Sequence, residues 1–167
     1  YLEEEPKIAA LGAGLDIGKP SGCMVLDIGG GTTDVAVISL GEIVSSTSLK
    51  IAGDTLDRDI IKFVKENKKL LIGDRTAEEV KKQIGTAWKG SMHETIEVSG
   101  RDLVTGLPTT ITLSSEEIQG SMAESLQDVV RACKTVLEQT PPELASDIVT
   151  RGIVLTGGGA LLHGIDE

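Results

Sequence analysis

One segment limits what this chain can fold into more than any other: residues 23–40, CMVLDIGGGTTDVAVISL. An apolar run ends at Asp27, three glycines and two threonines follow, and an alternating apolar run then begins. Residues 23–28 are apolar on both faces, which predicts a buried strand, and residues 35–40 predict a second one. The glycines therefore lie in a hairpin between two strands, although a simple hairpin turn needs fewer of them.

This turn can be interpreted as a glycine-rich hairpin capped by Asp27, or as a cradle for phosphate. Glycines let backbone N–H groups approach an anion closely, and threonine hydroxyls can donate to phosphate oxygens. An acid at the end of a strand can hold Mg²⁺ through water. The Walker pattern is excluded, because it requires Gly-Lys-Ser/Thr and a following helix. The candidate phosphate contacts are Gly29, Gly30, Gly31, Thr32 and Thr33.

A second glycine turn lies in residues 152–162, GIVLTGGGALL, which predict a buried strand, a turn and the start of a helix. A helix N-terminus attracts anions, and glycine lets a flat ring lie on the backbone. Close packing of a strand on a helix would explain the same glycines. Two such turns in one small domain favour a nucleotide between them. The candidate residues are Gly157, Gly158, Gly159 and Ala160.

Three other acids have both structural and functional interpretations. Asp54 follows Gly53 at the end of a third strand, where it would cap a helix. Glu78 and Lys81 lie on one helical face and would form a surface salt bridge or contact a ribose and an adenine. Glu5 precedes a helix, so it would compensate the helix dipole or orient a water for attack on a γ-phosphate.

The remaining pattern predicts a helix, three antiparallel strands, two helices, two exposed strands, a long helix, a short helix and a last strand. Gly41-Glu42 predicts the turn before the third strand. Thr76 with Glu79, and Ser114 with Glu117, predict capping boxes. The predicted helices cover residues 3–14, 54–67, 115–139 and 142–151, with another beginning at Thr76, and the further strands cover residues 43–51, 93–100 and 109–113.

This order predicts a split core with an insertion. Residues 1–54 and 118–167 form the core, and residues 55–117 form a small α+β insertion. The chain has 167 residues and a net charge of -10, which argues against a nucleic-acid partner. Its two cysteines, Cys23 and Cys133, are too few and too separated for a disulfide or metal framework, and are expected to be buried thiols.

The motifs E-P, D-I-G-G-G-T-T-D, A-G-D, E-x-x-K and L-T-G-G-G-A-L-L occur here in the order of the actin-like ATPases, which include actin, heat-shock chaperones and sugar kinases. The segments TGLP and TPPEL make the chain resemble the MreB and Mbl-type family of bacterial actin homologues. The resemblance implies an α/β, actin-like ATPase (ribonuclease H-like) domain with a mixed sheet. It also implies that the chain corresponds to domain II, with subdomain IIA as the core and subdomain IIB as the insertion.

The resemblance further implies residue roles. Glu5 and Asp27 match the catalytic acid and the acid that holds Mg²⁺ through water. Residues 29–33 match the second phosphate loop, Gly53 and Asp54 border the sugar, Glu78 and Lys81 contact ribose and adenine, and residues 157–160 form the adenosine loop. The first phosphate loop belongs to the family's other half, so this chain alone is expected to hydrolyse ATP at most very weakly.

For the whole protein, the resemblance implies MgATP binding and self-association into filaments at the inner face of the cell membrane, in the cytoplasm. It implies membrane contact through the other half, and partners in cell-wall elongation, including a RodZ-type adaptor. Two alternatives remain: a catalytically silent structural or adaptor-binding module, and a chaperone ATPase or sugar kinase. The presence of Glu5 and Asp27 argues against the first, and TGLP and TPPEL argue against the second.

Overall fold

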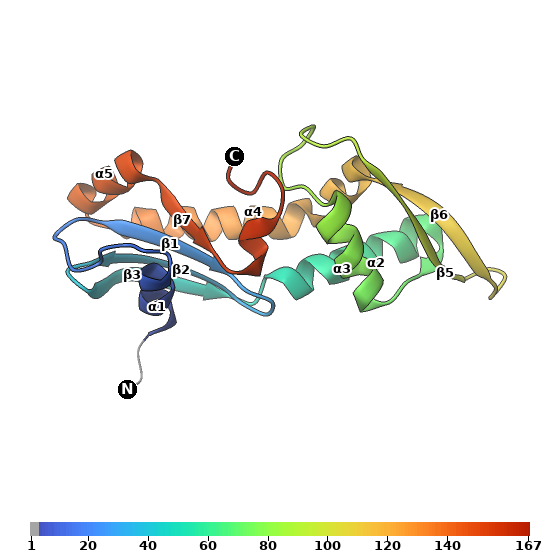
Figure 1. The fold of residues 1–167 in the computed structure, drawn as a ribbon, viewed down its shortest axis with the longest axis horizontal. Helices are drawn as coiled ribbons and strands as arrows, with labels where there is room; N and C mark the ends of the chain where they lie inside the picture. Colours follow the sequence, from blue (N-terminus) through green and yellow to red (C-terminus); the bar gives the residue numbers. More distant parts are fainter. Residues whose placement is uncertain (1–3) are drawn as a thin grey trace. The chain divides into compact units, whose positions relative to one another are not determined.

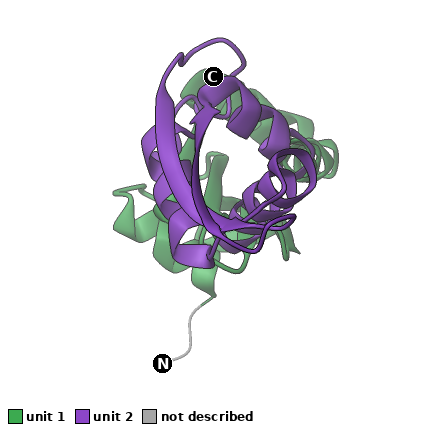
Figure 2. Ribbon diagram, turned by 90° about the vertical axis from the view of Figure 1, so that its right-hand side faces the viewer, with its two compact units in different colours: residues 1–53, 127–160 green, residues 54–126, 161–167 purple. Residues whose placement is uncertain are grey.

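The computed structural model describes residues 4–167, so Glu3 of the acidic run before Pro6 lies outside the described residues. The chain divides into two compact units, coloured separately in Figure 2. Unit 1 comprises Tyr1–Gly53 and Gln127–Ala160, and unit 2 comprises Asp54–Leu126 and Leu161–Glu167.

Unit 1 is built on a four-stranded sheet with the strand order β3-β2-β1-β7 (Figure 1). β1, β2 and β3 form the antiparallel meander predicted from the sequence, and β7 lies parallel to β1. The sheet is therefore mixed, as the predicted fold class requires. The strands are β1 Cys23–Ile28, β2 Thr33–Ser39, β3 Glu42–Leu49 and β7 Ile153–Thr156.

Two details of this sheet differ from the prediction. β7 is half-buried to exposed rather than buried, because it lies at an edge and pairs only with β1. The β2–β3 turn is Leu40-Gly41 rather than Gly41-Glu42, since Glu42 already pairs with Ser39. Leu40 and Gly41 have φ values of 53° and 75°. Two successive positive φ values are typical of a type I′ hairpin turn, which matches the twist of the flanking strands.

In unit 1, α5 begins at Pro142 as the sequence predicts, whereas α1 begins at Glu5 rather than at residue 3. Prolines lie in the first turns of α1 and α5, where the missing N–H leaves no hydrogen bond unmade. α1 packs on β1 and β2 through Ala10, which shares an apolar cluster with Val25, Ala36 and Ile38. The bounds are α1 Glu5–Gly12, α5 Pro142–Arg151 and the 3-10 helix η1 Gly158–Leu161, and the long helix α4 Ser115–Glu138 belongs to unit 1 from Gln127 onward.

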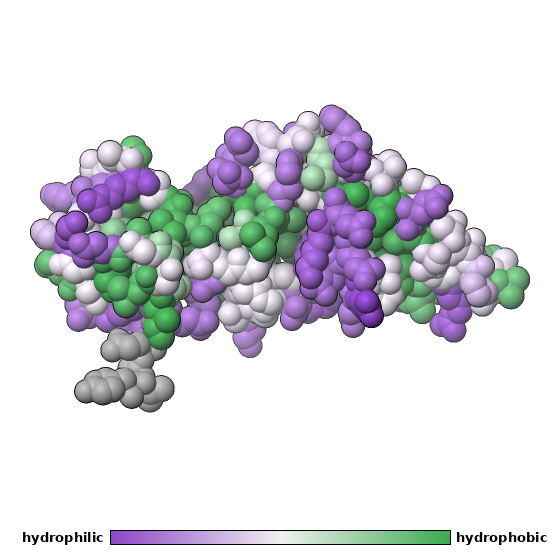
Figure 3. Space-filling view, viewed as in Figure 1, coloured by the Kyte–Doolittle hydropathy of each residue, from purple (hydrophilic) through white to green (hydrophobic). Residues whose placement is uncertain are grey.

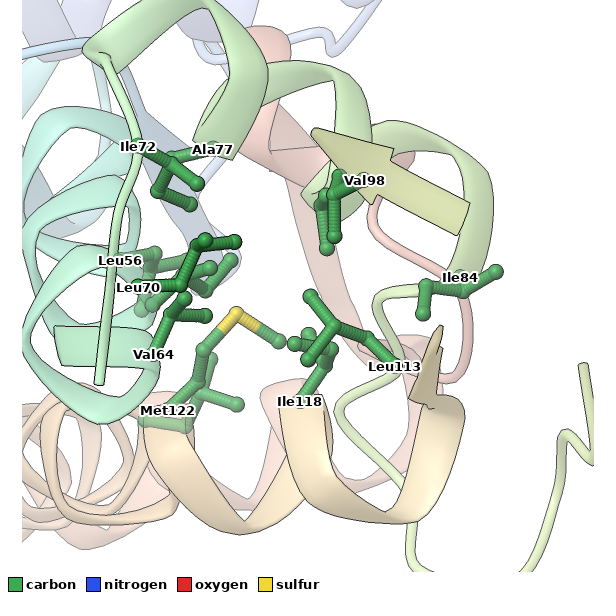
Figure 4. Close-up of a cluster of buried hydrophobic side chains, with 13 residues drawn as sticks. Leu56, Val64, Leu70, Ile72, Ala77, Ile84, Val98, Leu113, Ile118 and Met122 are labelled. Carbon is green, nitrogen blue, oxygen red and sulfur yellow. The ribbon is translucent and has the colours of Figure 1, made fainter. Parts of the chain in front are cut away.

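Unit 2 combines helices with a three-stranded sheet of order β4-β5-β6. Figure 4 shows its core, in which side chains of α2, α3, α4 and the sheet point toward one another. Leu56, Ile60 and Val64 recur every fourth residue, so one face of α2 is apolar and buried. The elements are α2 Gly53–Lys68, α3 Asp74–Ile84, β4 Leu70–Leu71, β5 Thr95–Asp102 and β6 Pro108–Ser114, with the first part of α4.

One of the two predicted capping boxes is wrong. α3 begins at Asp74 after Gly73 and has no side-chain cap, so Thr76 lies inside the first turn. The other box is confirmed. The Ser114 N–H donates to Glu117 Oε2 at 3.1 Å, and the Glu117 N–H donates to Ser114 Oγ at 3.3 Å.

A pair of substitutions tests this difference. Ser114→Ala should lower the free energy of unfolding of unit 2 by about 1 kcal/mol, because it removes an N-cap acceptor. Thr76→Ala should cost nothing, because alanine is the better helix former at an interior position. Urea denaturation followed by the fluorescence of Trp88, the chain's single tryptophan, measures both. Equal losses in the two variants would contradict the assignment of the caps.

The division into units differs in detail from the one predicted. Residues 118–126 and 161–167 were assigned to the core but lie in unit 2, where Ile118 and Met122 are buried in the apolar cluster. Cys23 and Cys133 are buried free thiols, as expected. Among residues 4–167, no helix is long and apolar enough to span a bilayer.

Candidate functional site

The first glycine turn is a tight connection between β1 and β2. Ile28 pairs with Thr33, and the Gly29 N–H donates to the Thr32 carbonyl at 2.9 Å. Gly31 is exposed, its φ lies outside the positive region, and a Cβ placed on it would contact nothing within 4 Å. Neither backbone strain nor packing within the chain therefore requires glycine at position 31. Close approach of a ligand to the backbone remains as a physical reason for it.

Side-chain and backbone hydrogen bonds fix this turn to the end of β3. The Thr33 hydroxyl is buried and donates to the Ile51 carbonyl at 2.6 Å. The Gly53 N–H donates to the Gly29 carbonyl at 3.1 Å. The single hydroxyl proton of Thr33 is thus committed inside the protein, whereas Thr32 is exposed to solvent. Of the two threonines, only Thr32 has a hydroxyl free to face a ligand.

The second glycine turn lies directly beside the first. Asp27 pairs with Thr156 in the parallel β1–β7 ladder, so the two turns follow the carboxyl ends of neighbouring strands and lie at the same end of the sheet. Gly157 has φ +83°, and a Cβ there would overlap Asp27 Oδ1 and the Ile28 carbonyl. A Cβ on Gly159 would overlap the Ile28 side chain. These two glycines are therefore required by the contact between the turns.

Gly158 differs from its two neighbours. It is exposed, its φ is outside the positive region, and a Cβ there would meet nothing within 4 Å. The predicted helix start is a four-residue 3-10 helix, in which the Ala160 N–H donates to the Gly157 carbonyl at 3.2 Å. So short a helix has little of the macrodipole expected of an α-helix N-terminus. Any contact with a ligand here would depend on the open backbone at Gly158.

Asp27 lies between the two turns, next to a second carboxylate that is not among the predicted site residues. Asp34 is its direct cross-strand neighbour in the β1–β2 ladder. Burial first, and then the negative charge of Asp34, raise the pKa of Asp27 above its ordinary value. A bound cation would offset this cost. The seven-residue spacing across the hairpin is the pattern that could have predicted the pair.

The donor set at Asp27 fits a hydrated Mg²⁺ better than a directly ligated metal. No group of three or more His, Cys, Asp or Glu side chains able to hold a metal occurs in residues 4–167. Mg²⁺ usually keeps several waters and needs only one or two carboxylates together with phosphate oxygens. The half-buried Asp27, with its raised pKa, supplies such a carboxylate.

Glu5 is the first residue of α1, and its side chain is exposed. Among the described residues, its carboxylate has no hydrogen-bond or ion-pair partner. The neighbouring Lys7 pairs with other acids rather than with Glu5. The Lys7 amine lies 3.0 Å from Glu4 Oε2 and 3.4 Å from Glu42 Oε2. The Glu5 carboxylate is therefore uncommitted to any described partner.

Unit 2 holds the three remaining candidates, and their partners differ from those expected. Glu78 pairs with Lys82 at 2.6 Å rather than with Lys81. Lys81 Nζ lies 2.8 Å from Asp57 Oδ1, and both side chains are only 14% exposed. Asp54 lies within the first turn of α2, which begins at Gly53, so it is not the N-cap.

The Lys81–Asp57 pair is a second feature that the sequence pattern does not predict. Burial raises the pKa of Asp57 above its ordinary value, although the hydrogen bond and charge of Lys81 oppose this shift. Asp57 follows Asp54 by three residues on the same helix, a spacing that places both on one face of α2. The charge of Lys81 is thus held in place by a buried carboxylate.

Comparison with known proteins gives one consistent result. The sequence pattern of the MreB/Mbl protein family matches residues 1–167. The cell shape-determining protein Mbl of Bacillus cereus is 58% identical over 166 residues, which are 99% of this chain and 50% of that protein. The cell shape-determining protein MreB of Escherichia coli is 53% identical over 167 residues, which are 48% of its length. The chain therefore spans about half the length of the curated relatives it matches.

Solved structures agree with this. MreB5 of Spiroplasma citri bound to AMPPNP superposes with a TM-score of 0.92 at 47% identity, covering 96% of this chain and 48% of that one. The same protein has also been solved bound to ADP. The fold is therefore that of an actin-like protein.

Proposed function

This chain belongs to the MreB/Mbl family, and on that basis we propose that it binds a magnesium–nucleoside triphosphate complex, MgATP, at the two glycine turns of unit 1. The observation that carries the proposal is the pair Gly31 and Gly158. Nothing in the chain's own conformation or packing explains a glycine at either position. Both flank Asp27 at one edge of the sheet, and a ligand that contacts the backbone would explain them together.

Phosphate oxygens would accept from the backbone N–H groups of Gly30, Gly31 and Thr32 and from the Thr32 hydroxyl, and Gly29 would border them because its own N–H donates to the Thr32 carbonyl. Thr33 would act indirectly, because its hydroxyl holds the turn to Ile51. Asp27 would hold Mg²⁺ through water, and the ion would supply positive charge for the phosphates. The turn residues proposed to contact or border phosphate are Gly29, Gly30, Gly31 and Thr32.

Nucleoside contacts are proposed at the other predicted positions. Glu78 and Lys81 would contact the ribose and adenine, and Gly53 and Asp54 would border the sugar. Asp57 would keep the Lys81 amine in place through their 2.8 Å ion pair. The adenosine loop would consist of Gly157, Gly158, Gly159 and Ala160.

For the whole protein, we propose ATP hydrolysis with Glu5 orienting the attacking water. The uncommitted carboxylate of Glu5 supports that role. Preorganised charge and positioning would then supply the rate acceleration. Because this chain spans half the length of its relatives, we expect it to bind nucleotide without measurable steady-state turnover. Robust turnover that Glu5→Ala abolishes would contradict this expectation.

We also propose that the whole protein self-associates into filaments beneath the cell membrane, in the cytoplasm. The relatives are named as cell shape-determining proteins, which supports a role in organising cell-wall synthesis. A RodZ-type adaptor and membrane contact through the other half of the protein are part of this proposal.

The Asp27→Asn variant tests nucleotide binding. With Mg²⁺ present, its affinity for a fluorescent ATP analogue should be at least about tenfold lower than that of the unchanged chain, because one charge-assisted contact is lost. Its thermal stability should be equal or higher, since the raised pKa shows that the charged carboxylate is disfavoured in the free protein. Titrations of the ATP analogue in Mg²⁺ and in EDTA measure the Mg²⁺-dependent and the Mg²⁺-independent parts of this affinity.

Asp16→Asn is the matched control, because Asp16 is an exposed acid of unit 1 paired with Lys19 at 3.0 Å. It should leave nucleotide affinity unchanged. Equal affinity of Asp27→Asn and the unchanged chain in Mg²⁺ would refute the assigned role of Asp27. Absence of any nucleotide binding by the unchanged chain would contradict the proposed site.

A further inference from the structure

Two segments of unit 2 that are far apart in the sequence are joined by polar contacts. Thr86 and His163 form an isolated parallel β-bridge, and the Ala87 N–H donates to the His163 carbonyl at 2.8 Å. The Thr86 Oγ1 atom lies 3.0 Å from His163 Nδ1 and 2.8 Å from Ser91 Oγ. Figure 1 shows the two segments side by side near the C-terminus. We refer to Thr86, Ser91 and His163 as the clasp.

The Thr86 hydroxyl is at the centre of the clasp. Thr86 is only 1% exposed, and its hydroxyl can bond either tautomer of His163, because a hydroxyl both donates and accepts. Ser91 Oγ donates to the Trp88 carbonyl at 2.7 Å, so its lone pairs are left for Thr86. In Figure 3 mostly hydrophilic and intermediate colours cover the loop between α3 and β5, at the top of the view. The loop has little apolar surface to bury, and the hydrogen bonds of the clasp therefore matter for fixing its position.

The segment that contains His163 is also fixed by packing. Gly164 has φ +69°, and a Cβ placed on it would lie 2.8 Å from Trp88 Cβ. Leu162 and Ile165 are half-buried and pack against the apolar core of unit 2. This segment is therefore held against the loop between α3 and β5 by close packing and by the clasp together.

The clasp closely follows, along the chain, both segments proposed to contact the nucleoside. Thr86 is the second residue after the end of α3, the helix that carries Glu78 and Lys81. His163 is three residues beyond Ala160, the last residue of the adenosine loop. Three residues of extended chain span at most about 11 Å. While the clasp is closed, Ala160 therefore cannot move farther than this from His163.

We propose that Thr86 and His163 are positioning residues for the nucleoside. The clasp keeps the adenosine loop within reach of α3, so the base and the ribose meet groups from both segments at once. Without the clasp the two segments separate for part of the time, and the apparent affinity falls with the fraction of chains in which they remain together. The first glycine turn, where the phosphates are proposed to bind, belongs to the other unit, so phosphate binding does not depend on the clasp. This inference rests on the proposed nucleotide site.

The test measures the affinity of the chain for a fluorescent ATP analogue in Mg²⁺, with tripolyphosphate as a competitor that has no nucleoside. Thr86→Val and His163→Leu should each weaken binding of the ATP analogue by about five- to tenfold, since each removes hydrogen bonds of the clasp. The affinity for tripolyphosphate should be unchanged in both variants. Thr86→Ser and His163→Asn should restore most of the lost affinity, because each keeps a polar atom in the clasp.

His93→Leu is the matched control. His93 is the chain's other histidine, is exposed in unit 2, and pairs with Glu116 at 2.6 Å outside the clasp. Its replacement should leave both affinities unchanged. Circular dichroism checks the fold of every variant. His163 is exposed, so the result for His163→Leu stands even if the variant of the buried Thr86 does not fold.

The inference is overturned if His163→Leu binds the ATP analogue as tightly as the unchanged chain does. It is also overturned if the clasp variants lose affinity for tripolyphosphate and for the ATP analogue equally, because the clasp would then act on the fold as a whole. Failure of both conservative replacements to restore binding would have the same consequence. Absence of ATP-analogue binding by the unchanged chain is a different result, which would refute the proposed function and this inference with it.

Discussion

Replacing Gly157 by alanine should lower the free energy of unfolding of unit 1 by roughly 3 kcal/mol. Two costs add at this position. Gly157 has φ +83°, a conformation that alanine adopts only with strain, and its Cβ would overlap the Ile28 carbonyl and Asp27 Oδ1. The Ile28 carbonyl belongs to the backbone at the end of an inner strand, so it cannot move aside as a flexible side chain can. Hydrogen exchange of the β1 and β7 amides measures the loss within unit 1.

Gly158→Ala is the matched control one residue away. A Cβ at Gly158 meets nothing within 4 Å, and its φ is outside the positive region. Stability should therefore be unchanged or slightly higher, because alanine restricts the unfolded chain. The same variant should weaken binding of an ATP analogue if the ligand lies on this backbone. Equal destabilisation by the two substitutions would show that the contact between the glycine turns is not as described.

Replacing Lys81 by methionine should destabilise unit 2 by about 3 kcal/mol at neutral pH, because it leaves Asp57 buried without its ion-pair partner. Trp88 fluorescence during urea denaturation reports on this unit. Lys82→Met is the control. Lys82 forms an exposed pair with Glu78, and loss of an exposed pair has little effect on stability.

The stability that Lys81→Met loses should become smaller as the pH falls. Burial already raises the pKa of Asp57 above its ordinary value of 3.8, and without Lys81 this pKa rises further. A group with a raised folded-state pKa contributes stability below its unfolded pKa, and this stability is lost as pH rises through the folded value. The difference between Lys81→Met and the unchanged chain should thus shrink in acid. Adding Asp57→Asn to Lys81→Met should remove the pH dependence; a difference that stays constant with pH would contradict the buried pair.

The sequence was most informative where local pattern and tertiary environment agree. β1 was predicted with its observed bounds because both faces of a central strand are apolar, and the Ser114–Glu117 box has the expected reciprocal bonds. The family was identified from TGLP, TPPEL and the order of the glycine turns, and the match over residues 1–167 confirms it. The mixed sheet followed from that identification.

Features that depend on contacts between distant segments could not be predicted. Thr33 is like Thr32 in sequence, and only its burial against Ile51 separates their roles. The partner of Lys81 is on another helix, so spacing within α3 favoured Glu78 instead. Thr76 and Glu79 fit the capping-box pattern, but the helix starts two residues earlier, at Asp74. In each case a tertiary contact or an alternative start outweighs a weak local preference.

The pairing of β1 with β7 has a consequence for the order in which the chain folds. Met24 pairs with Ile153, so β7 is the last strand of the unit 1 sheet to be synthesised, after the helices α2, α3 and α4. By then the hairpin and all three helices that form most of the unit 2 core have already been made. Contacts distant in sequence form slowly because a long loop must close first. During synthesis, the side of β1 that later pairs with β7 stays unpaired until the helices of unit 2 have been made.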